Sequence, residues 1–188
     1  MPPLPPPEER SLHAVGARRR DPPEPGVAEI VRLLRELAKD APGLVALLDA
    51  DGVAGERHLL SAWAHLGRSR ARGAVRLRDR SAEFVLYVAG DDQLPRALAK
   101  VGVGEGTSRF VVVAERPLEP ESLLERFGLV ADPDAYPRPV TAETLERLGI
   151  GAADRSSVPP GSWEGLILER VAMVDLATGS GRGPPPKS

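Results

Sequence analysis

The sequence predicts an α/β (α+β) domain built on a mixed sheet of about four strands, with helices on both faces. Two short runs, Leu44 to Asp49 and Phe110 to Ala114, are almost wholly apolar. Such runs are typical of strands that are covered on both sides. The segments around them carry apolar residues at spacings of three and four, which is typical of helices packed against a sheet. A third run, Glu83 to Val88, is interpreted as a further buried strand.

The length of 188 residues predicts a single domain, over residues 27–178, which is long enough to bury a sizeable core. Eight prolines lie within residues 1–26, together with the run Arg18-Arg19-Arg20. Because proline lacks a backbone donor and fixes φ, this stretch is expected to be a disordered tail. Residues 179–188 are rich in glycine and proline and are expected to form a second, flexible tail.

Composition narrows the classes of function. The sequence has no cysteine, which excludes disulfides, thiolate metal sites and cysteine nucleophiles. It has no apolar run of about 18 residues and no apolar centre of a signal peptide near its start, so a cytoplasmic protein is expected. Of the 25 basic residues only three are lysine. Arginine suits bidentate binding of phosphate, although high Arg, Ala, Gly and Pro together also fit a codon bias.

The first predicted helix spans Val27 to Lys39 and has one apolar stripe. Pro42-Gly43 ends it, the strand from Leu44 follows, and Asp51-Gly52 turns the chain. The next helix begins at Gly55 and continues to about Arg70. This order of elements predicts a strand flanked on both sides by helices.

The second helix is predicted to be apolar on one face and basic on the other. The polar arc carries Arg57, Ser61, His65, Arg68 and Arg72, with His58 at its edge. The segment from Ala74 to Ser81 adds Arg76, Arg78 and Arg80. Residues 57–80 hold seven arginines and one aspartate, so the local net charge is +6. Such a cluster attracts phosphates, whereas exposed arginines more often only solvate a face.

The third apolar run is expected to end at Gly90. Asp91 or Asp92 is then expected to cap a helix over Leu94 to Val101. The glycine-rich stretch Gly102 to Thr107 superficially resembles a phosphate loop. A helix precedes it and a strand follows, which reverses the dinucleotide-binding order, so it is interpreted as a helix end and turn.

Three helices are predicted in the last third of the chain, at Pro120 to Phe127, at Thr141 to Leu148 and from Trp163 to about Ala177. The last is apolar on more than one side. A surface helix of one domain is expected to show a single stripe, so the excess predicts a second buried contact, within the domain or with a partner. Its apolar residues are expected to divide between the core and an exposed patch.

A catalytic function is not expected, because no serine elbow, kinase loop or Walker lysine is present. His58 and His65 are seven residues apart, without the glutamate of a zinc-protease helix. Asp132 and Asp134 have no evident third ligand, so no metal and no other cofactor is predicted. His58 lies in the first turn of its helix, where the helix dipole favours a neutral ring. It is interpreted either as locally hydrogen-bonded or as a platform for a base.

An ordered set of residues in the middle third of the chain resembles a known family. These residues are Gly55, His58, Leu59, Ala62, Glu83, Leu86, Tyr87, Gly90, Gln93, Leu94, Ala97, Gly102 and Val103. In order and spacing they resemble the TPRKB-like, kinase-binding subunit of the KEOPS (EKC) complex. The family often has a basic residue just before the glutamine, where this chain has Asp92.

The resemblance implies a non-catalytic subunit that binds and stimulates the small atypical kinase/ATPase of KEOPS and meets its other subunits indirectly. It also implies that the protein helps to recruit tRNA, through its 3′ CCA end, for threonylcarbamoylation of the adenosine next to the anticodon. The kinase contact is expected on the C-terminal helix, at Leu166, Ile167, Arg170, Val171, Met173 and Val174. The RNA contact is expected at Arg57, His58, Arg68, Arg72, Arg76 and Gln93.

A different class of function stays open, a stand-alone small-ligand or nucleotide-binding regulatory protein. Such a regulator needs a concave apolar cavity with converging polar groups. An adaptor is instead expected to show a flat apolar patch beside a basic strip.

Overall fold

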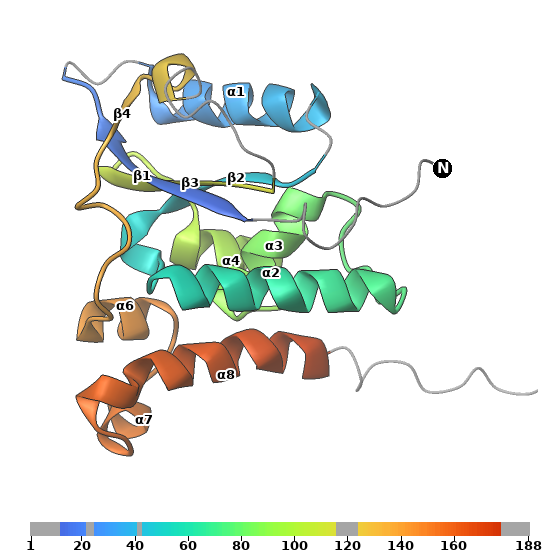
Figure 1. Ribbon diagram of the computed structural model, residues 1–188, viewed down its shortest axis with the longest axis vertical. Helices are drawn as coiled ribbons and strands as arrows, with labels where there is room; N and C mark the ends of the chain where they lie inside the picture. The colour runs from blue at the N-terminus through green and yellow to red at the C-terminus, as the bar shows by residue number, and fades with distance from the viewer. Residues whose placement is uncertain (1–11, 22–24, 41–42, 116–123, 178–188) are drawn as a thin grey trace, which may run out of the picture.

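The computed structural model describes residues 12–21, 25–40, 43–115 and 124–177. These residues form an α+β domain around one four-stranded sheet (Figure 1). The strands are β1 (His13–Arg19), β2 (Val45–Asp49), β3 (Arg109–Ala114) and β4 (Leu129–Ala131), in the order β2-β3-β1-β4. The predicted fold class and the predicted number of strands are confirmed.

The pairing in this sheet is antiparallel throughout, not mixed as predicted. β3 lies in the middle, where Val113 pairs with Ala46 of β2 on one side and with Ala14 of β1 on the other. β4 pairs with the far side of β1. β2 and β4 are therefore the two edges of the described sheet.

Helices cover both faces of the sheet, as predicted (Figure 1). α1 (Val27–Asp40) lies on one face, and α2 (Glu56–Ala71), α3 (Arg80–Ala89) and α4 (Leu94–Val101) lie on the other. α8 (Trp163–Leu176) packs on the outer side of α2 and α3 and so forms a further layer. The short elements are η2 (Ala50–Gly52), α6 (Ala142–Arg147), α7 (Ala152–Ser156) and η3 (Pro160–Ser162).

Each face of the sheet has its own apolar core. The smaller core joins Ile30 of α1 to Leu47 of β2 and Phe110 of β3. The larger core joins the other face of the sheet to α2, α3 and α4, and it extends through them to α8. Burial of apolar surface in these two layers supplies most of the stabilising free energy of such a fold.

The run Glu83 to Val88 is the helix α3 and not a strand, so this prediction was wrong. Asp79 caps the helix, accepting hydrogen bonds from the backbone N–H of Ser81 (2.8 Å) and of Ala82 (3.2 Å). All residues from Glu83 to Ala89 are buried, because α3 lies between the sheet and α8. A helix buried on every side has no polar face, and a short apolar run of this kind cannot be told from a buried strand by its periodicity.

The prediction of a disordered tail over residues 1–26 was wrong for residues 13–19, which form β1. The prolines of this stretch lie on both sides of residues 13–19 and not within them, so every backbone N–H of β1 can join a ladder. Gly16 is required there, since a Cβ on it would lie 2.4 Å from the carbonyl oxygen of Asp132. β1 is thus an interior strand of the domain.

The other predicted helices agree with the structure where it describes them. Thr141 caps α6 by accepting a hydrogen bond from the N–H of Thr144 at 3.1 Å. Of the helix predicted at 120–127 the structure describes residues 124–127, and residues 124–126 of these are helical. The calls on residues 1–11 and 179–188 lie outside the described residues. None of the helices in the described ranges combines the length and apolarity needed to cross a membrane.

Candidate functional site

One side of α8 belongs to the core of the domain. Ile167, Val171 and Val174 are at most 2% exposed and share the larger core with α2 and α3. Side chains buried to this extent cannot touch a partner. Their predicted role as direct kinase contacts was therefore wrong, and their role is to hold α8 in place.

A second side of α8 faces away from the core. Met173 is 56% exposed and Leu176 is 66% exposed, while Leu166 is partly buried and Arg170 is exposed. At 100° per residue these four residues fall within one arc of the helix, which we call the α8 outer stripe. The apolar residues of α8 thus divide between the core and an exposed patch, as predicted.

A cluster of polar side chains fixes the end of α8 against α2 and α3. Asp175 accepts a hydrogen bond from the Tyr87 hydroxyl at 2.8 Å and lies 2.7 Å from Nδ1 of His65. The His65 and Tyr87 rings are stacked, with centroids 6.1 Å apart. Burial acts to raise the pKa of Asp175, but His65, Tyr87 and the guanidinium of Arg72 hold it below its usual value. The carboxylate is therefore charged at neutral pH and joins three helices.

Gly90, at the end of α3, lies against Arg170 of α8. It ends α3 in the left-handed region at φ 59°, which favours glycine. A Cβ on Gly90 would also lie 2.9 Å from the Cβ of Arg170. The glycine therefore couples the end of α3 to the position of α8.

His58 is wholly buried, so its predicted role as a platform for a base was wrong. Its Nε2–H donates to the carbonyl oxygen of Val88 at 2.8 Å, and its Nδ1 accepts from the N–H of Ala54 at 3.1 Å. These two bonds require the neutral ring. Burial lowers the pKa of His58 to about 4, although the bond to Val88 acts in the opposite direction. His58 thus joins the start of α2 to the end of α3.

Glu83 is a buried charge that organises the segment between α2 and α3. Its side chain is 0% exposed and lies 2.7 Å from the guanidinium of Arg70. Its second oxygen accepts from the backbone N–H of Arg76 at 3.0 Å. Arg70 also donates to the carbonyl oxygen of Leu77 at 2.8 Å. This network holds residues 70–77 in a fixed course beside α3 and α8.

Most of the predicted RNA-binding arginines make contacts within the domain. Arg57 pairs with Glu164 of α8 at 2.6 Å. Arg72 lies 3.5 Å from Asp175, and Arg76 donates to the carbonyl oxygen of Val174. The structure therefore brings these three arginines together along α8, where Arg57 and Arg72 lie beside carboxylates and Arg76 bonds to the backbone.

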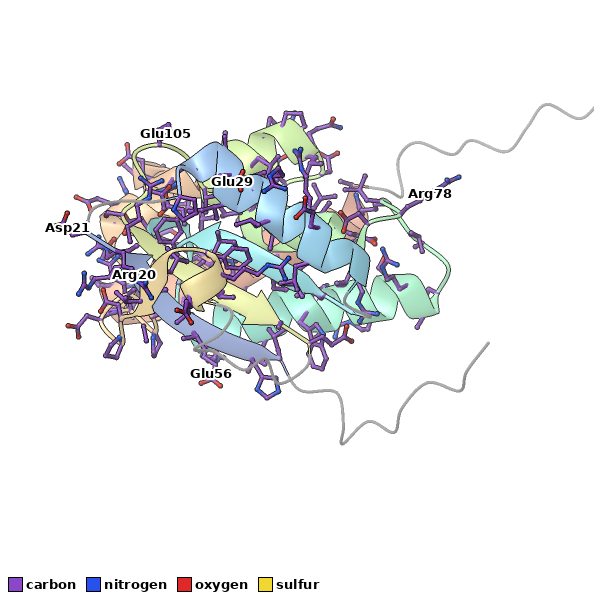
Figure 2. All side chains as sticks on the ribbon, turned by 90° about the horizontal axis from the view of Figure 1, so that it is seen from above. Arg20, Asp21, Glu29, Glu56, Arg78 and Glu105 are labelled. Carbon is purple, nitrogen blue, oxygen red and sulfur yellow. The ribbon has the colours of Figure 1, made fainter. Side chains whose placement is uncertain are left out.

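Two arginines of the same segment remain available. Arg68 is exposed, and no ion pair joins it to another described residue. Arg78 is also exposed and extends away from the body of the domain (Figure 2). Gln93 is exposed at the start of α4. The basic surface is thus smaller than the sequence predicts, but it is present.

The carboxylates of the turn before α4 are neutralised. Asp92, which departs from the family pattern, accepts a hydrogen bond from Arg96 at 2.8 Å. Asp91 lies 2.9 Å from Arg96 and 3.0 Å from Lys100. Burial acts to raise the pKa of Asp91, but its bonds to Arg96, to the backbone of Gln93 and to Lys100 lower it to about 2. Asp92 is accordingly paired with a cation and does not stand alone beside Gln93.

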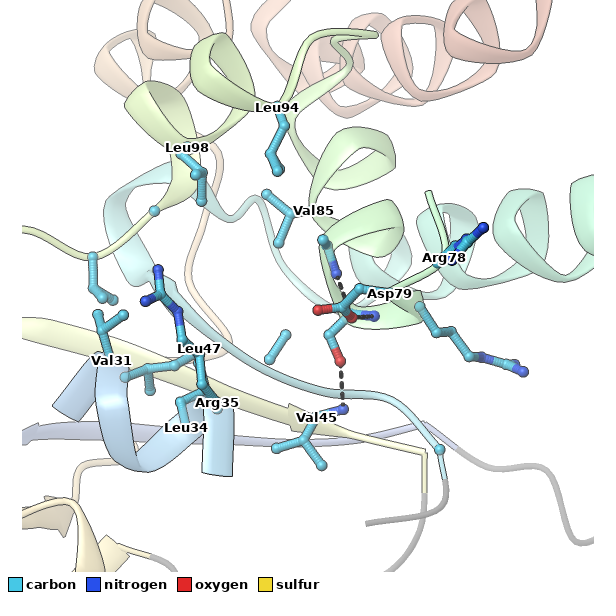
Figure 3. Close-up of a pocket in the computed structure, with 17 residues that line it drawn as sticks. Val31, Leu34, Arg35, Val45, Leu47, Arg78, Asp79, Val85, Leu94 and Leu98 are labelled. Atoms are coloured by element: carbon cyan, nitrogen blue, oxygen red, sulfur yellow. Dashed lines mark hydrogen bonds between the residues drawn. The ribbon is translucent and has the colours of Figure 1, made fainter. Parts of the chain in front are cut away.

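A groove of about 890 Å³ lies beside the edge strand β2 (Figure 3). Its floor is formed by Val45 and Leu47, one wall by α1 and the other by α3 and α4. No feature of the sequence indicated it, because it is made by residues from four separate elements. It shares no lining residue with the α8 outer stripe.

No group of three or more histidine, aspartate or glutamate side chains among the described residues is placed to hold a metal ion. A search of family models and a search of curated proteins gave no match to this chain.

One residue of the site was missed from the sequence. Asp175 fixes α8 to its neighbours through its contacts with Tyr87 and His65. The signal that could have found it is a lone carboxylate in the apolar last turns of α8. A charge in such a setting needs a buried partner.

Proposed function

We propose that the protein is a non-catalytic subunit of the KEOPS complex. In this proposal it binds and stimulates the small atypical kinase/ATPase of the complex and helps to recruit tRNA by its 3′ CCA end. The observation that carries the proposal is the α8 outer stripe, where Met173 and Leu176 are exposed apolar side chains on a helix whose other side is buried in the core. Exposed apolar patches of this kind mark interaction surfaces.

The residues that resemble the family support the same surface. Gly90 admits Arg170 of α8, and Tyr87 binds Asp175 of α8. His58 holds the end of α3 that carries Gly90. These three motif residues thus help to position the helix on which the resemblance expects the kinase contact.

Kinase binding should be lost when the outer stripe receives a charge. We expect Met173→Glu and Leu176→Glu each to weaken binding of the purified kinase subunit by about 10- to 100-fold, because a carboxylate buried in an apolar interface loses its solvation. Isothermal titration calorimetry measures this effect, and far-UV circular dichroism confirms the fold of each variant.

Leu98→Glu is the matched control for this experiment. Leu98 is 48% exposed on α4, so the control introduces the same change at another exposed apolar position away from α8. We expect it to bind the kinase like the wild type. Equal affinity of Met173→Glu and the wild type would contradict the kinase contact on α8.

For tRNA binding, the proposal relies on the arginines that do not contact α8. Arg68 is expected to contact a backbone phosphate, with Gln93 reading a base edge of the single-stranded end. Loss of one phosphate contact lowers the slope of log affinity against log salt by about 0.7 for a single strand. We expect Arg68→Ala to show this change in anisotropy titrations with tRNA.

Arg32→Ala serves as the control for RNA binding. Arg32 is exposed on α1 and already pairs with Glu29 and Glu36, so its removal should leave the salt slope unchanged. We further expect tRNA without its CCA end to bind more weakly than intact tRNA. Equal affinity for the two would contradict recruitment by the 3′ end.

A second candidate is a small-ligand-binding regulatory protein, and the observation that favours it is the groove beside β2. Its walls are apolar, as in a ligand site, and its volume is within the usual range of about 300–1,000 Å³. The polar groups that line it include the backbone of an edge strand and charged side chains such as Arg35. These polar groups determine which kind of ligand the groove can bind.

A further inference from the structure

The floor of the groove is an edge strand with free backbone groups. The carbonyl oxygen of Leu44 accepts from the N–H of Glu115, so Leu44, Ala46 and Leu48 are the residues of β2 that bond to β3. Alternation then turns the N–H and C=O of Leu47, and the C=O of Val45, toward the groove. No hydrogen bond from another described residue reaches these groups. Leu47 is 5% exposed, so this edge is poorly placed to be solvated in full.

One position of this edge already has a substitute for a strand partner. The N–H of Val45, which also points toward the groove, donates to the hydroxyl of Ser81 at 3.1 Å (Figure 3). Ser81 belongs to the first turn of α3, which closes this end of the groove. Beyond Ser81 the next outward groups are those of Val45 C=O and Leu47, which line the groove although both residues are largely buried.

The walls of the groove fit side chains on both sides of an added strand. On the α1 side the lining residues are Val31 and Leu34, and on the α3 and α4 side they are Val85, Leu94 and Leu98. Leu98 is 48% exposed although it faces this apolar surface. A strand between two such walls would bury side chains of both alternating sets.

The charge at the groove is positive. Arg35 is exposed on α1 with its guanidinium directed toward the groove (Figure 3), and no carboxylate among the described residues pairs with it. Arg78 lies at the rim and is likewise unpaired within the described part of the chain. Asp79 caps α3, and Arg80 pairs with Glu115 at 2.7 Å, so both of these charged side chains already have partners. An acidic group on the occupant would complement Arg35.

We propose that this groove binds an extended peptide segment of a partner protein, which adds a strand to the free edge of β2. The segment pairs its backbone with Leu47, places apolar side chains against both walls and carries an acidic residue that meets Arg35. Main-chain pairing gives such a site its affinity, and the side-chain pockets give it specificity. The site is separate from the α8 outer stripe and does not depend on the proposed KEOPS function.

The backbone groups decide between a peptide and a small ligand. The free acceptor and donor groups of Val45 and Leu47 are spaced as in a ladder, which another main chain matches group by group. A small apolar carboxylate would satisfy Arg35 and the walls, but it has no donors for this row of groups. A strand pairing also covers the edge, which unprotected strands otherwise leave open to unwanted pairing.

The test uses a phage-displayed library of linear heptapeptides, selected on the full chain and counter-selected on the Leu98→Glu variant. We expect enriched peptides with three consecutive β-branched or apolar residues and an acidic residue beside them. The best peptide is then synthesised in two forms, one unmodified and one N-methylated at alternate residues. N-methylation removes the donors of one edge, and the loss of about two hydrogen bonds should weaken binding by tenfold or more.

Three further measurements make the result specific. Arg35→Glu should weaken binding of the acidic peptide by about fivefold or more. Met173→Glu, on the other surface, should bind the peptide with the affinity of the wild type. Amide exchange of Leu47, followed by NMR, should slow when the peptide is bound. Circular dichroism and thermal melts exclude loss of the fold in each variant.

The proposal is overturned if no peptide discriminates the wild type from Leu98→Glu, or if the N-methylated peptide binds equally well. It is also overturned if dodecanoate binds in an Arg35-dependent manner while no peptide does, since the groove would then be a small-ligand site. Loss of kinase binding in Met173→Glu tests the other surface and is independent of all these outcomes.

Discussion

Replacing Glu83 with alanine is expected to lower the free energy of unfolding by about 3–5 kcal/mol, because it leaves a partly buried guanidinium without its carboxylate. Glu83 is 0% exposed, and the Arg70 side chain opposite it is only 24% exposed. The backbone N–H of Arg76 loses its acceptor in the same variant. Urea unfolding, followed by circular dichroism, measures the difference.

Glu164→Ala is the control for this prediction. Glu164 pairs with Arg57 at 2.6 Å, but the side chain of Arg57 is 70% exposed. Ion pairs of this kind contribute about 0–1 kcal/mol. If Glu83→Ala and Glu164→Ala destabilise the protein equally, the buried pair does not hold the segment between α2 and α3.

Acid should weaken the fold through His58 at a pH above the range where carboxylates titrate. The pKa of His58 is about 4 in the folded protein, against about 6.5 when the chain is unfolded. The unfolded chain therefore binds a proton first, so this stabilisation is complete above pH 6.5 and is lost as the pH falls toward 4. The loss amounts to roughly 3 kcal/mol, from about 1.4 kcal/mol per pKa unit.

The variant His58→Gln tests how much of the pH dependence of stability comes from His58. Glutamine offers an NH2 group as donor and a carbonyl oxygen as acceptor but does not titrate in this range. The variant should be less stable than the wild type at pH 7.5, and the difference should shrink as the pH falls from 6.5 to 4. Parallel stability profiles of the two proteins over this range would show that His58 is not held neutral by burial.

The elements that could be predicted from the sequence are those with a one-sided pattern. α1 has a clear apolar stripe, and its prediction was off by one residue at its end. β2 and β3 are short apolar runs beside turn residues, and both were found. The excess of apolar residues on α8 correctly indicated two surfaces, since the core takes Ile167, Val171 and Val174 and leaves Met173 and Leu176 outside.

The elements that could not be predicted depend on distant neighbours. α3 loses its helical pattern because the sheet and α8 bury it on all sides. His58 sits in the first turn of α2, and only the approach of Val88, thirty residues on, shows that its ring is enclosed. Arg57 and Arg72, expected to contact RNA, likewise form surface ion pairs with carboxylates of α8. Such contacts are set by packing between elements, which no local pattern reports.

β1 comes early in the chain and yet lies between β3 and β4 in the sheet. During synthesis it leaves the ribosome long before either neighbour, so its backbone groups stay in water until β3 and then β4 have emerged. Closing the sheet is then a late step that joins remote parts of the chain, of the kind that slows folding and prolongs exposure to aggregation. Proteolysis that removed residues up to 19 would likewise take out an inner strand and leave β3 and β4 without their shared neighbour.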